Sequence, residues 1–352
     1  MLFDERPKET LQDFYNREKE LEELKRAIGR PIIVLAGGRK IGKTSMLKVF
    51  LSECTFPNAL VDVYQYSDNP YKIFSAILTQ LNKKSIGKML SDALKNIAGV
   101  SIHGIKIELS WKKVANLQDI FDQVNSLGEK VIIGIDGAEN FRGKFEKNIT
   151  SLLAHCYDYC KNITFILTGT EIGLVYEILS NNKPDSPLFG RYIERVQLKP
   201  FSKSMSTDFL KKGFSQYKMN VEEDLIDYAT DRLGGVVGRL VELGSMAVRR
   251  GVLTKELIDE VAERAALIAR MDLDHYPPKY RYVVKAIASG CKSLGEIKEF
   301  LKRNMKSEVS EVKDYQLYHI LNMLMILGYI TKDEQGNYEI LDPIIKVLHI
   351  IL

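Results

Sequence analysis

The stretch AGGRKIGKT, residues 36–44, directly follows the apolar run PIIVL at residues 31–35. A strand that ends in a glycine-rich loop is either a tight turn or a cradle for a phosphate chain. The stretch matches the pattern G-x-x-x-x-G-K-S/T through Gly37, Gly42, Lys43 and Thr44, and the residues after it have the apolar period of a helix. Because a phosphate cradle needs this order of strand, loop and helix, we predict a nucleotide-binding loop.

Each part of the loop has a physical task in holding phosphates. The glycines let successive backbone N–H groups point at the phosphates, and the helix N-terminus adds a positive partial charge. Lys43 supplies a charge for the β- and γ-phosphates, and the Thr44 hydroxyl supplies a ligand for Mg²⁺. The residues expected to contact the nucleotide are Gly37, Gly38, Arg39, Lys40, Ile41, Gly42, Lys43, Thr44 and Ser45.

Further apolar runs alternate with helical patterns along the first half of the chain. The runs are ALVDVYQY (59–66), KVIIGID (130–136) and ITFILTG (163–169). Such alternation predicts an α/β fold, in which a parallel sheet is covered by helices on both faces. Helices are expected near residues 16–28, 70–83, 117–127 and 144–160, and a hairpin at 100–111.

The aspartate at the end of KVIIGID, Asp136, lies where P-loop ATPases place an acid that holds Mg²⁺. The alternative is a solvated strand end. With the loop already present, we favour the metal-binding role, which makes Thr44 and Asp136 the expected metal ligands.

After residue 205 the pattern changes to helices, broken at Gly234-Gly235 and at Gly251. From Tyr276 onward, three helical patterns (280–289, 293–303 and 314–327) precede two short strands around a Gly-Asn turn, which predicts a winged helix. We therefore expect a P-loop ATPase domain at 1–205, a helical lid at 206–272 and a winged-helix domain at 273–352.

The composition is that of a globular protein: 352 residues, 45% hydrophobic and 27% charged, with a net charge of +4. This charge is too mild to demand a nucleic-acid partner. No apolar run approaches the roughly 18 residues of a membrane span, and MLFDERPKET lacks the apolar core of a secretion signal. The expectation is a cytoplasmic protein that does not bind membranes.

Four cysteines and five histidines are scattered along the chain. Cys156 and Cys160 are four residues apart and can share a helix face, but no histidine or second cysteine pair completes a metal site. We expect all four cysteines to be buried or idle thiols.

Several segments together resemble the archaeal ATPase family, which belongs to the AAA+/STAND-like P-loop ATPases and is related to archaeal origin-recognition ATPases. The likeness covers nearly the whole chain. It is carried by FYNREKELEELK (14–25), GGRKIGKTSML (37–47), VIIGIDGAENF (131–141), FILTGT (165–170), PLFGRYIERVQLKPFS (187–202) and LGGVVGRLVELG (233–244). The resemblance also implies adenine rather than guanine as the base.

The resemblance implies roles for residues outside the loop. Phe14, Asn16 and Arg17 would lie near the adenine and the ribose. Thr168 or Thr170 would be the polar sensor of the γ-phosphate. Arg191 would read the γ-phosphate in its own or a neighbouring subunit, with a surface salt bridge as the alternative.

Two positions depart from the family pattern. Members usually carry a glutamate directly after the aspartate, to orient the attacking water, but here Gly137 follows Asp136, and Glu139 is the nearest acid. Val237 stands where the family tends to have a proline at the base pocket, and Arg239 after it is a candidate lid sensor. The first departure puts the turnover of ATP in doubt.

In residues 275–352, nine Lys and two Arg stand against six Glu and three Asp, a net charge of +2. The third helix of this domain presents no Lys or Arg among its expected exposed residues, Tyr315, Gln316, His319, Asn322 and Met323, so DNA binding is not favoured. We expect a slow ATPase that acts as a switch on a protein partner, with oligomer formation open. The alternatives are a DNA-associated ATPase and a scaffold without turnover; a small-molecule kinase is a weaker fourth reading.

Overall fold

The computed structural model describes residues 1–66, 71–110, 116–141, 144–169, 179, 184–305 and 313–346. The chain divides into two compact units. The first unit consists of residues 7–198, and the second consists of residues 1–6 together with 199–352. The division into three domains that the sequence suggested stays a prediction.

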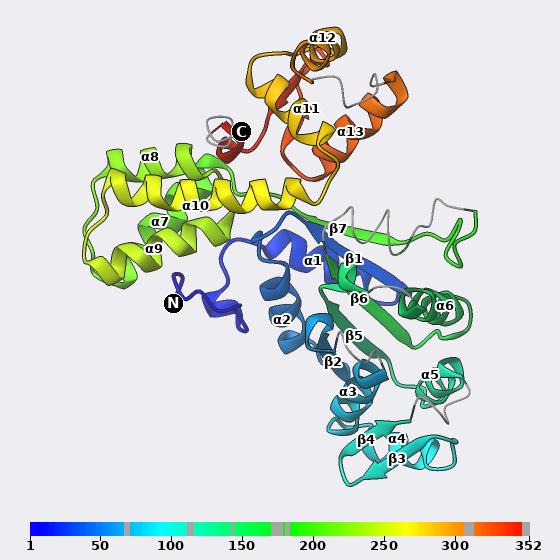
Figure 1. The fold of residues 1–352 in the computed structure, drawn as a ribbon. Helices are drawn as coiled ribbons and strands as arrows, with labels where there is room; N and C mark the ends of the chain where they lie inside the picture. The colour runs from blue at the N-terminus through cyan, green and yellow to red at the C-terminus, as the bar shows by residue number, and fades with distance from the viewer. Residues whose placement is uncertain are drawn as a thin grey trace. The chain divides into compact units, whose positions relative to one another are not determined.

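A five-stranded sheet forms the centre of the first unit (Figure 1), with the strand order β2-β5-β6-β1-β7. All four neighbouring pairs are parallel, which confirms the predicted sheet. The edge strand β7 was not predicted. The strands are β1 (Ile32–Gly37), β2 (Asn58–Asp62), β5 (Val131–Asp136), β6 (Ile163–Gly169) and β7 (Glu194–Leu198).

Helices cover both faces of this sheet because successive strand residues point to opposite sides. Ile32 and Val34 pack into the cluster that holds α3, α5 and α6, whereas Ile33 and Leu35 pack against α1 and α2. Figure 1 shows α2 and α6 on opposite sides of the sheet. These helices are α1 (Glu18–Ala27), α2 (Lys43–Glu53), α3 (Tyr71–Asn82), α5 (Leu117–Ser126) and α6 (Lys144–Tyr159).

Smaller elements complete the first unit. The strand expected at 59–66 ends at Asp62, and a 3-10 helix, η2 (Val63–Tyr66), continues it, with Tyr64 71% exposed. The predicted hairpin is confirmed as β3 (Val100–His103) and β4 (Lys106–Leu109), paired antiparallel. The other short elements are η1 (Leu11–Asp13), α4 (Gly87–Leu94) and η3 (Ala138–Asn140).

The second unit contains four helices before the winged helix, and two of them, α7 and α9, pack on the side chain of Phe3, which is 2% exposed. Gly213 and Gly244 make room for its ring, since a Cβ atom at either position would lie within 2.5 Å of it. The first six residues therefore belong to the second unit, although residue 7 already belongs to the first. The helices are α7 (Lys203–Gln216), α8 (Glu223–Leu233), α9 (Val237–Arg250) and α10 (Lys255–Asp274).

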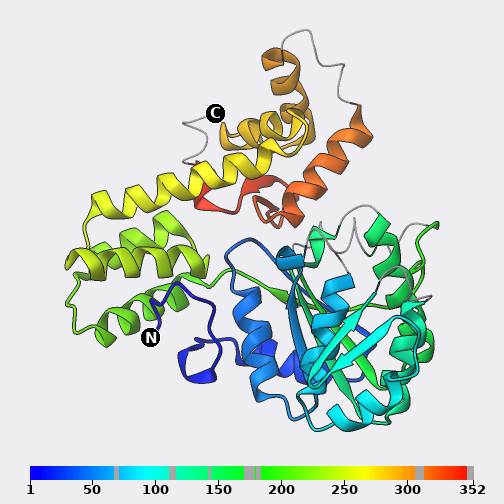
Figure 2. The ribbon, with the colours of Figure 1, turned by 60° about the horizontal axis from the view of Figure 1, so that its bottom comes forward.

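The predicted winged helix follows α10 (Figure 2). It comprises α11 (Lys279–Ala288), α12 (Leu294–Asn304), α13 (Asp314–Ile326) and the antiparallel strands β8 (Ile330–Lys332) and β9 (Tyr338–Ile340). Ser293 and Glu296 form a capping box that fixes the start of α12. Among the described residues, no helix is both long and apolar enough to cross a bilayer.

Candidate nucleotide-binding site

The loop between β1 and α2 has the backbone that its glycines allow. Gly42 has φ 99° and Lys40 has φ 57°, both in the left-handed region. A Cβ atom on Gly37 would lie 2.9 Å from the Leu198 carbonyl oxygen, so only glycine fits against the end of β7. A Cβ atom on Gly38 would meet nothing within 4 Å, so the backbone there borders open space that a ligand can enter.

The Lys43 ammonium lies within this loop. It donates hydrogen bonds to the carbonyl oxygens of Gly37, at 3.0 Å, and Gly38, at 2.8 Å. Burial lowers the pKa of Lys43, and the carboxylates of Glu139 and Asp136 oppose that shift. A half-buried cation that bonds to carbonyl dipoles and lies near carboxylates suits a phosphate chain, which would supply stronger charge-assisted hydrogen bonds.

Asp136 joins three elements at the carboxyl end of the sheet. Its Oδ2 accepts a hydrogen bond from the Thr44 hydroxyl at 2.8 Å, and its Oδ1 accepts one from the Thr168 hydroxyl. The Thr168 hydroxyl oxygen also accepts a hydrogen bond from the Gly137 N–H at 3.0 Å. One hydroxyl on β6 therefore holds both the Asp136 side chain and the backbone that follows β5. The structure thus brings together the three residues that the sequence singled out here.

This donor set fits a magnesium ion. A hydroxyl and a carboxylate, both oxygen donors, lie side by side at the first turn of α2, and Mg²⁺ binds through few protein oxygens plus phosphates and waters. Thr44 and Asp136 are the residues that would hold it.

Gly137 has a conformation that favours glycine. Its φ is 68°, and a Cβ atom there would lie 3.1 Å from the Asn140 amide nitrogen. The Asn140 amide donates to the Gly137 carbonyl oxygen at 2.8 Å and holds this turn. Glu139 follows on η3 with its Oε2 atom buried, and its carboxylate acts electrostatically on Lys43. An acid therefore lies beside the loop, two positions later than the family pattern puts it.

The residues expected near the base lie at the start of α1. Arg17 is 5% exposed and pairs with Glu20 at 2.7 Å, which places its charge in a fixed ion pair. Asn16 has φ 50°, and Phe14 packs on the apolar cluster of α1 and α2. Their contacts with a base stay predictions.

Ser45 has a partner in the chain segment before α1. Its hydroxyl oxygen accepts a hydrogen bond from the Lys8 N–H at 3.0 Å, and Glu9 pairs with Lys48 at 2.8 Å. Residues 8 and 9 therefore run along the first turns of α2, immediately after the loop. Ser45 is thus held by the protein itself, so its expected nucleotide contact stays a prediction.

Arg191 does not join the site within its own chain. The last residue of β7, Leu198, lies beside Gly37 of the loop. Arg191 lies three residues before the first residue of β7 and therefore at the opposite, amino end of this strand. The five residues of β7 alone span roughly 13 Å. Its guanidinium pairs with Asp158 at 2.7 Å, as the salt-bridge alternative predicted. Reading of the γ-phosphate within one subunit is therefore not supported, and reading across subunits stays a prediction.

Arg239 on α9 also has a fixed partner. It donates to both carboxylate oxygens of Asp342, at 2.7 and 2.6 Å, and to the Leu233 carbonyl oxygen at 3.0 Å. The pair is almost buried and joins α9 to the chain after β9. Its role as a lid sensor stays a prediction, and Thr170 lies outside the described residues.

Two residues at the carboxyl end of the sheet, near Asp136, were not identified from the sequence. Asn140 holds the Gly137 turn, and nothing in its spacing indicated that role. Asp62, at the end of β2, lies in register beside Asp136. The apolar run ALVD ends in an aspartate just as KVIIGID does, and this shared ending is the sequence signal by which Asp62 could have been found.

Comparisons with known proteins agree with this geometry. The model of a family described as an ATPase domain predominantly from Archaea matches residues 14–243, and the winged helix-turn-helix domain at the C-terminus of MCM proteins matches residues 277–341. A solved Walker-type ATPase of Pyrococcus abyssi is 28% identical over 99% of each chain, with a TM-score of 0.78.

A more distant structure shares the fold. The ORC2 protein of Aeropyrum pernix, solved as ADPNP–ADP complexes, is 16% identical over 99% of this chain and 96% of its own, with a TM-score of 0.63. At this identity the likeness concerns the fold alone. No curated protein sequence matches the chain.

Proposed function

We propose, from the premise that this chain belongs to the family of ATPase domains found predominantly in Archaea, that it binds ATP with Mg²⁺ and hydrolyses it slowly as a nucleotide-controlled switch. The observation that carries the proposal is the hydrogen bond between Thr44 and Asp136 beside the half-buried Lys43. A tight turn needs neither an ammonium held inside the loop nor a carboxylate at the end of a nearby strand.

The residues of the loop divide the work of binding. Lys43 can leave the loop carbonyls and donate to phosphate oxygens, and the backbone at Gly38 borders open space in which a phosphate can lie. Thr168 is a positioning residue, since it orients Asp136 through a hydrogen bond. When bound, Mg²⁺ neutralises charge on the phosphates.

Slow turnover is supported by the turn at Gly137. A glutamate at that position would need a left-handed backbone and would crowd Asn140, so the usual water-orienting group has no place there. Glu139 is the acid that we assign to this task, because it lies close enough to Lys43 to oppose the lowering of the Lys43 pKa that burial causes. A group that reaches the water from a later turn is expected to be less well oriented.

A switch needs a part whose arrangement differs between ATP and ADP. We assign this role to the second unit, with the winged helix as the surface that a protein partner reads. Residues 1–6 belong to this second unit, whereas the chain segment that follows them binds Ser45 next to the loop. The N-terminal segment thus connects the nucleotide site to the unit that would move.

A DNA-associated ATPase remains the second candidate, because the MCM winged-helix model matches residues 277–341. The exposed residues of α13 include Tyr315, Tyr318 and His319 but no arginine, and Lys298 is paired with Asp314 at 2.5 Å. Met323, expected on this face, is instead 8% exposed and packs inward, whereas Tyr318 is exposed. This face offers aromatic rings rather than cations to a phosphate backbone, so DNA is not favoured.

The proposal includes the cytoplasm as the compartment. All four cysteines are free, and thiols stay reduced in that compartment. The same proposal leaves room for a second copy of the chain, which Arg191 would need in order to reach a nucleotide.

The test of slow hydrolysis is the change Glu139→Gln. We expect the single-turnover rate of ATP cleavage to fall by about 100-fold, because the amide cannot accept the water proton, while ATP affinity changes less than about threefold. The rate is measured with protein in excess over labelled ATP and Mg²⁺.

Glu129→Gln serves as the matched control, since Glu129 is exposed at the other end of β5. Wild-type turnover in the Glu139 variant would remove this residue from the proposal. Tight binding without any turnover by the wild-type protein would instead favour the scaffold alternative.

A further inference from the structure

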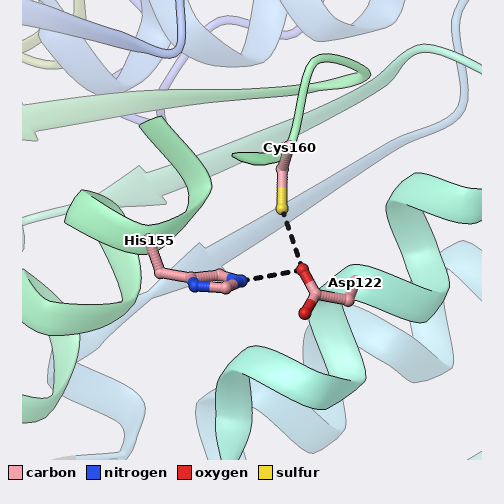
Figure 3. Close-up of side chains that lie close together, drawn as sticks. All are labelled: Asp122, His155 and Cys160. Atoms are coloured by element: carbon pink, nitrogen blue, oxygen red, sulfur yellow. Dashed lines mark hydrogen bonds and ion pairs between the residues drawn. The ribbon is translucent and has the colours of Figure 1, made fainter. Parts of the chain in front are cut away.

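Three side chains of different chemistry lie close together within the first unit, away from the nucleotide loop. Figure 3 shows Asp122, His155 and Cys160 pointing at one another. Oδ1 of Asp122 lies 2.7 Å from Nε2 of His155 and 3.6 Å from Sγ of Cys160. All three ligand atoms lie within 4.8 Å of one another.

The three residues come from two helices and the turn that follows one of them. Asp122 lies on α5, His155 on α6, and Cys160 directly after α6 and before β6. Because α6 runs back from the carboxyl edge of the sheet, Cys160 lies at the edge opposite to Asp136. The cluster is therefore separate from the nucleotide site.

The donor set has the chemistry of a zinc ligand set. Imidazole nitrogen, thiolate sulfur and carboxylate oxygen are the three donor types that Zn²⁺ uses in proteins. In a tetrahedral site with Zn–N of about 2.0 Å and Zn–S of about 2.3 Å, ligand atoms lie roughly 3.3 to 3.8 Å apart. The present separations approach this range, so small side-chain rotations suffice.

Charge and access also suit a divalent cation. A thiolate and a carboxylate would together balance the two charges of the ion, with the imidazole neutral. Cys160 is 2% exposed, whereas the side chains of Asp122 and His155 are 44% and 23% exposed. The soft ligand is thus held inside while solvent reaches the other two, which leaves a fourth position for water.

The surroundings hold the sulfur in place. The Cys156 side chain, one helical turn before Cys160, is 1% exposed and packs in the same apolar cluster as Cys160. The Cys160 N–H donates to the Cys156 carbonyl oxygen at 2.9 Å, which fixes the backbone at the end of α6. The cysteine pair therefore presents one sulfur from a rigid position.

We propose that Asp122, His155 and Cys160 bind one Zn²⁺ ion, which fastens α5 to the junction of α6 and β6. The ion would lie at the sheet edge that carries neither the loop nor Asp136, so its effect is expected on the joining of these elements and not on nucleotide binding. The proposal gives Cys160 a role beyond the buried or idle thiol expected from the sequence, in which the ligands lie 33 and 38 residues apart with no motif spacing.

The test uses Co²⁺ as an optical probe on the full-length protein after treatment with EDTA. We expect one Co²⁺ per chain, with a thiolate-to-cobalt charge-transfer band in the near ultraviolet and visible bands of tetrahedral intensity. Zn²⁺ should displace Co²⁺ with a stoichiometry of one and raise the melting temperature of the protein.

The variants Cys160→Ser and His155→Asn identify the ligands. Loss of a residue that only hydrogen-bonds to a metal ligand weakens metal binding by about 10- to 100-fold. Because Cys160 and His155 are themselves the proposed ligands, we expect each variant to weaken metal binding by more than about 100-fold. Cys54→Ser is the matched control, since Cys54 follows α2 elsewhere in the unit. ATP binding, measured on each variant, reports that the fold is intact.

Two results would overturn the proposal. One is a wild-type protein that gives no thiolate-to-cobalt band, a reading that needs no variant. The other is a band that survives in Cys160→Ser or disappears in Cys54→Ser.

Discussion

Replacing Lys43 with alanine is expected to weaken ATP binding by on the order of 100-fold. The lysine ammonium, which bonds the loop carbonyls in this structure, would donate charge-assisted hydrogen bonds to two phosphates, each worth about 1.5 to 3 kcal/mol. Hydrolysis should fall below detection for the same reason. Equilibrium titration with ATP and Mg²⁺ measures the loss.

Lys48→Ala is the matched control for this change. Lys48 lies on the same helix, α2, and pairs with Glu9 at the surface, so its loss should leave ATP affinity within about twofold of wild type. Equal affinities in wild type and Lys43→Ala would show that the phosphates bind elsewhere.

Replacing Asp136 with asparagine is expected to impair the use of Mg²⁺ while the binding of ATP itself is retained. A bound metal contributes several kcal/mol of charge stabilisation in the transition state, so turnover should fall by on the order of 100- to 1,000-fold. ATP binding in EDTA should be unchanged or tighter, because a negative charge beside the phosphates is gone. The measurement is ATP affinity and turnover across a Mg²⁺ titration.

An asparagine keeps an acceptor oxygen for Thr44 or Thr168, so the strand ends should stay joined. Asp119→Asn, on the exposed side of α5, is the control. A variant at Asp136 that retains the Mg²⁺ dependence of the wild type would remove this residue as the metal ligand.

The centre of the site was predictable because its signals are local. The strand, the loop and the start of α2 follow one another within AGGRKIGKT and its flanks, and the buried run before Asp136 marks a central strand. Apolar alternation between strands and helices then predicted the parallel sheet. In each case a short window contained the whole pattern.

Edge elements were less predictable. The strand β7 reads ERVQL, and only its third and fifth residues are buried, so it lacks the continuous apolar run of a central strand. The end of β2 was placed too late because the tyrosines after Asp62 suit a strand, whereas the backbone turns there into η2.

Long-range contacts could not be predicted from a single sequence. The position of Arg191 at the far edge follows from the direction of β7, which the sequence did not reveal. The group of Asp122, His155 and Cys160 depends on how α5 and α6 pack, and residues 33 positions apart carry no spacing signal. The turn at Gly137 likewise became interpretable only when its φ and the Asn140 contact were known.

The most direct test of the central claim is an equilibrium titration of the wild-type protein with ATP, with Mg²⁺ and then with EDTA. The arrangement of Lys43, Thr44 and Asp136 predicts saturable binding of one nucleotide per chain, tighter with Mg²⁺ than without it. An absence of saturable binding, or an affinity that EDTA leaves unchanged, would contradict the account.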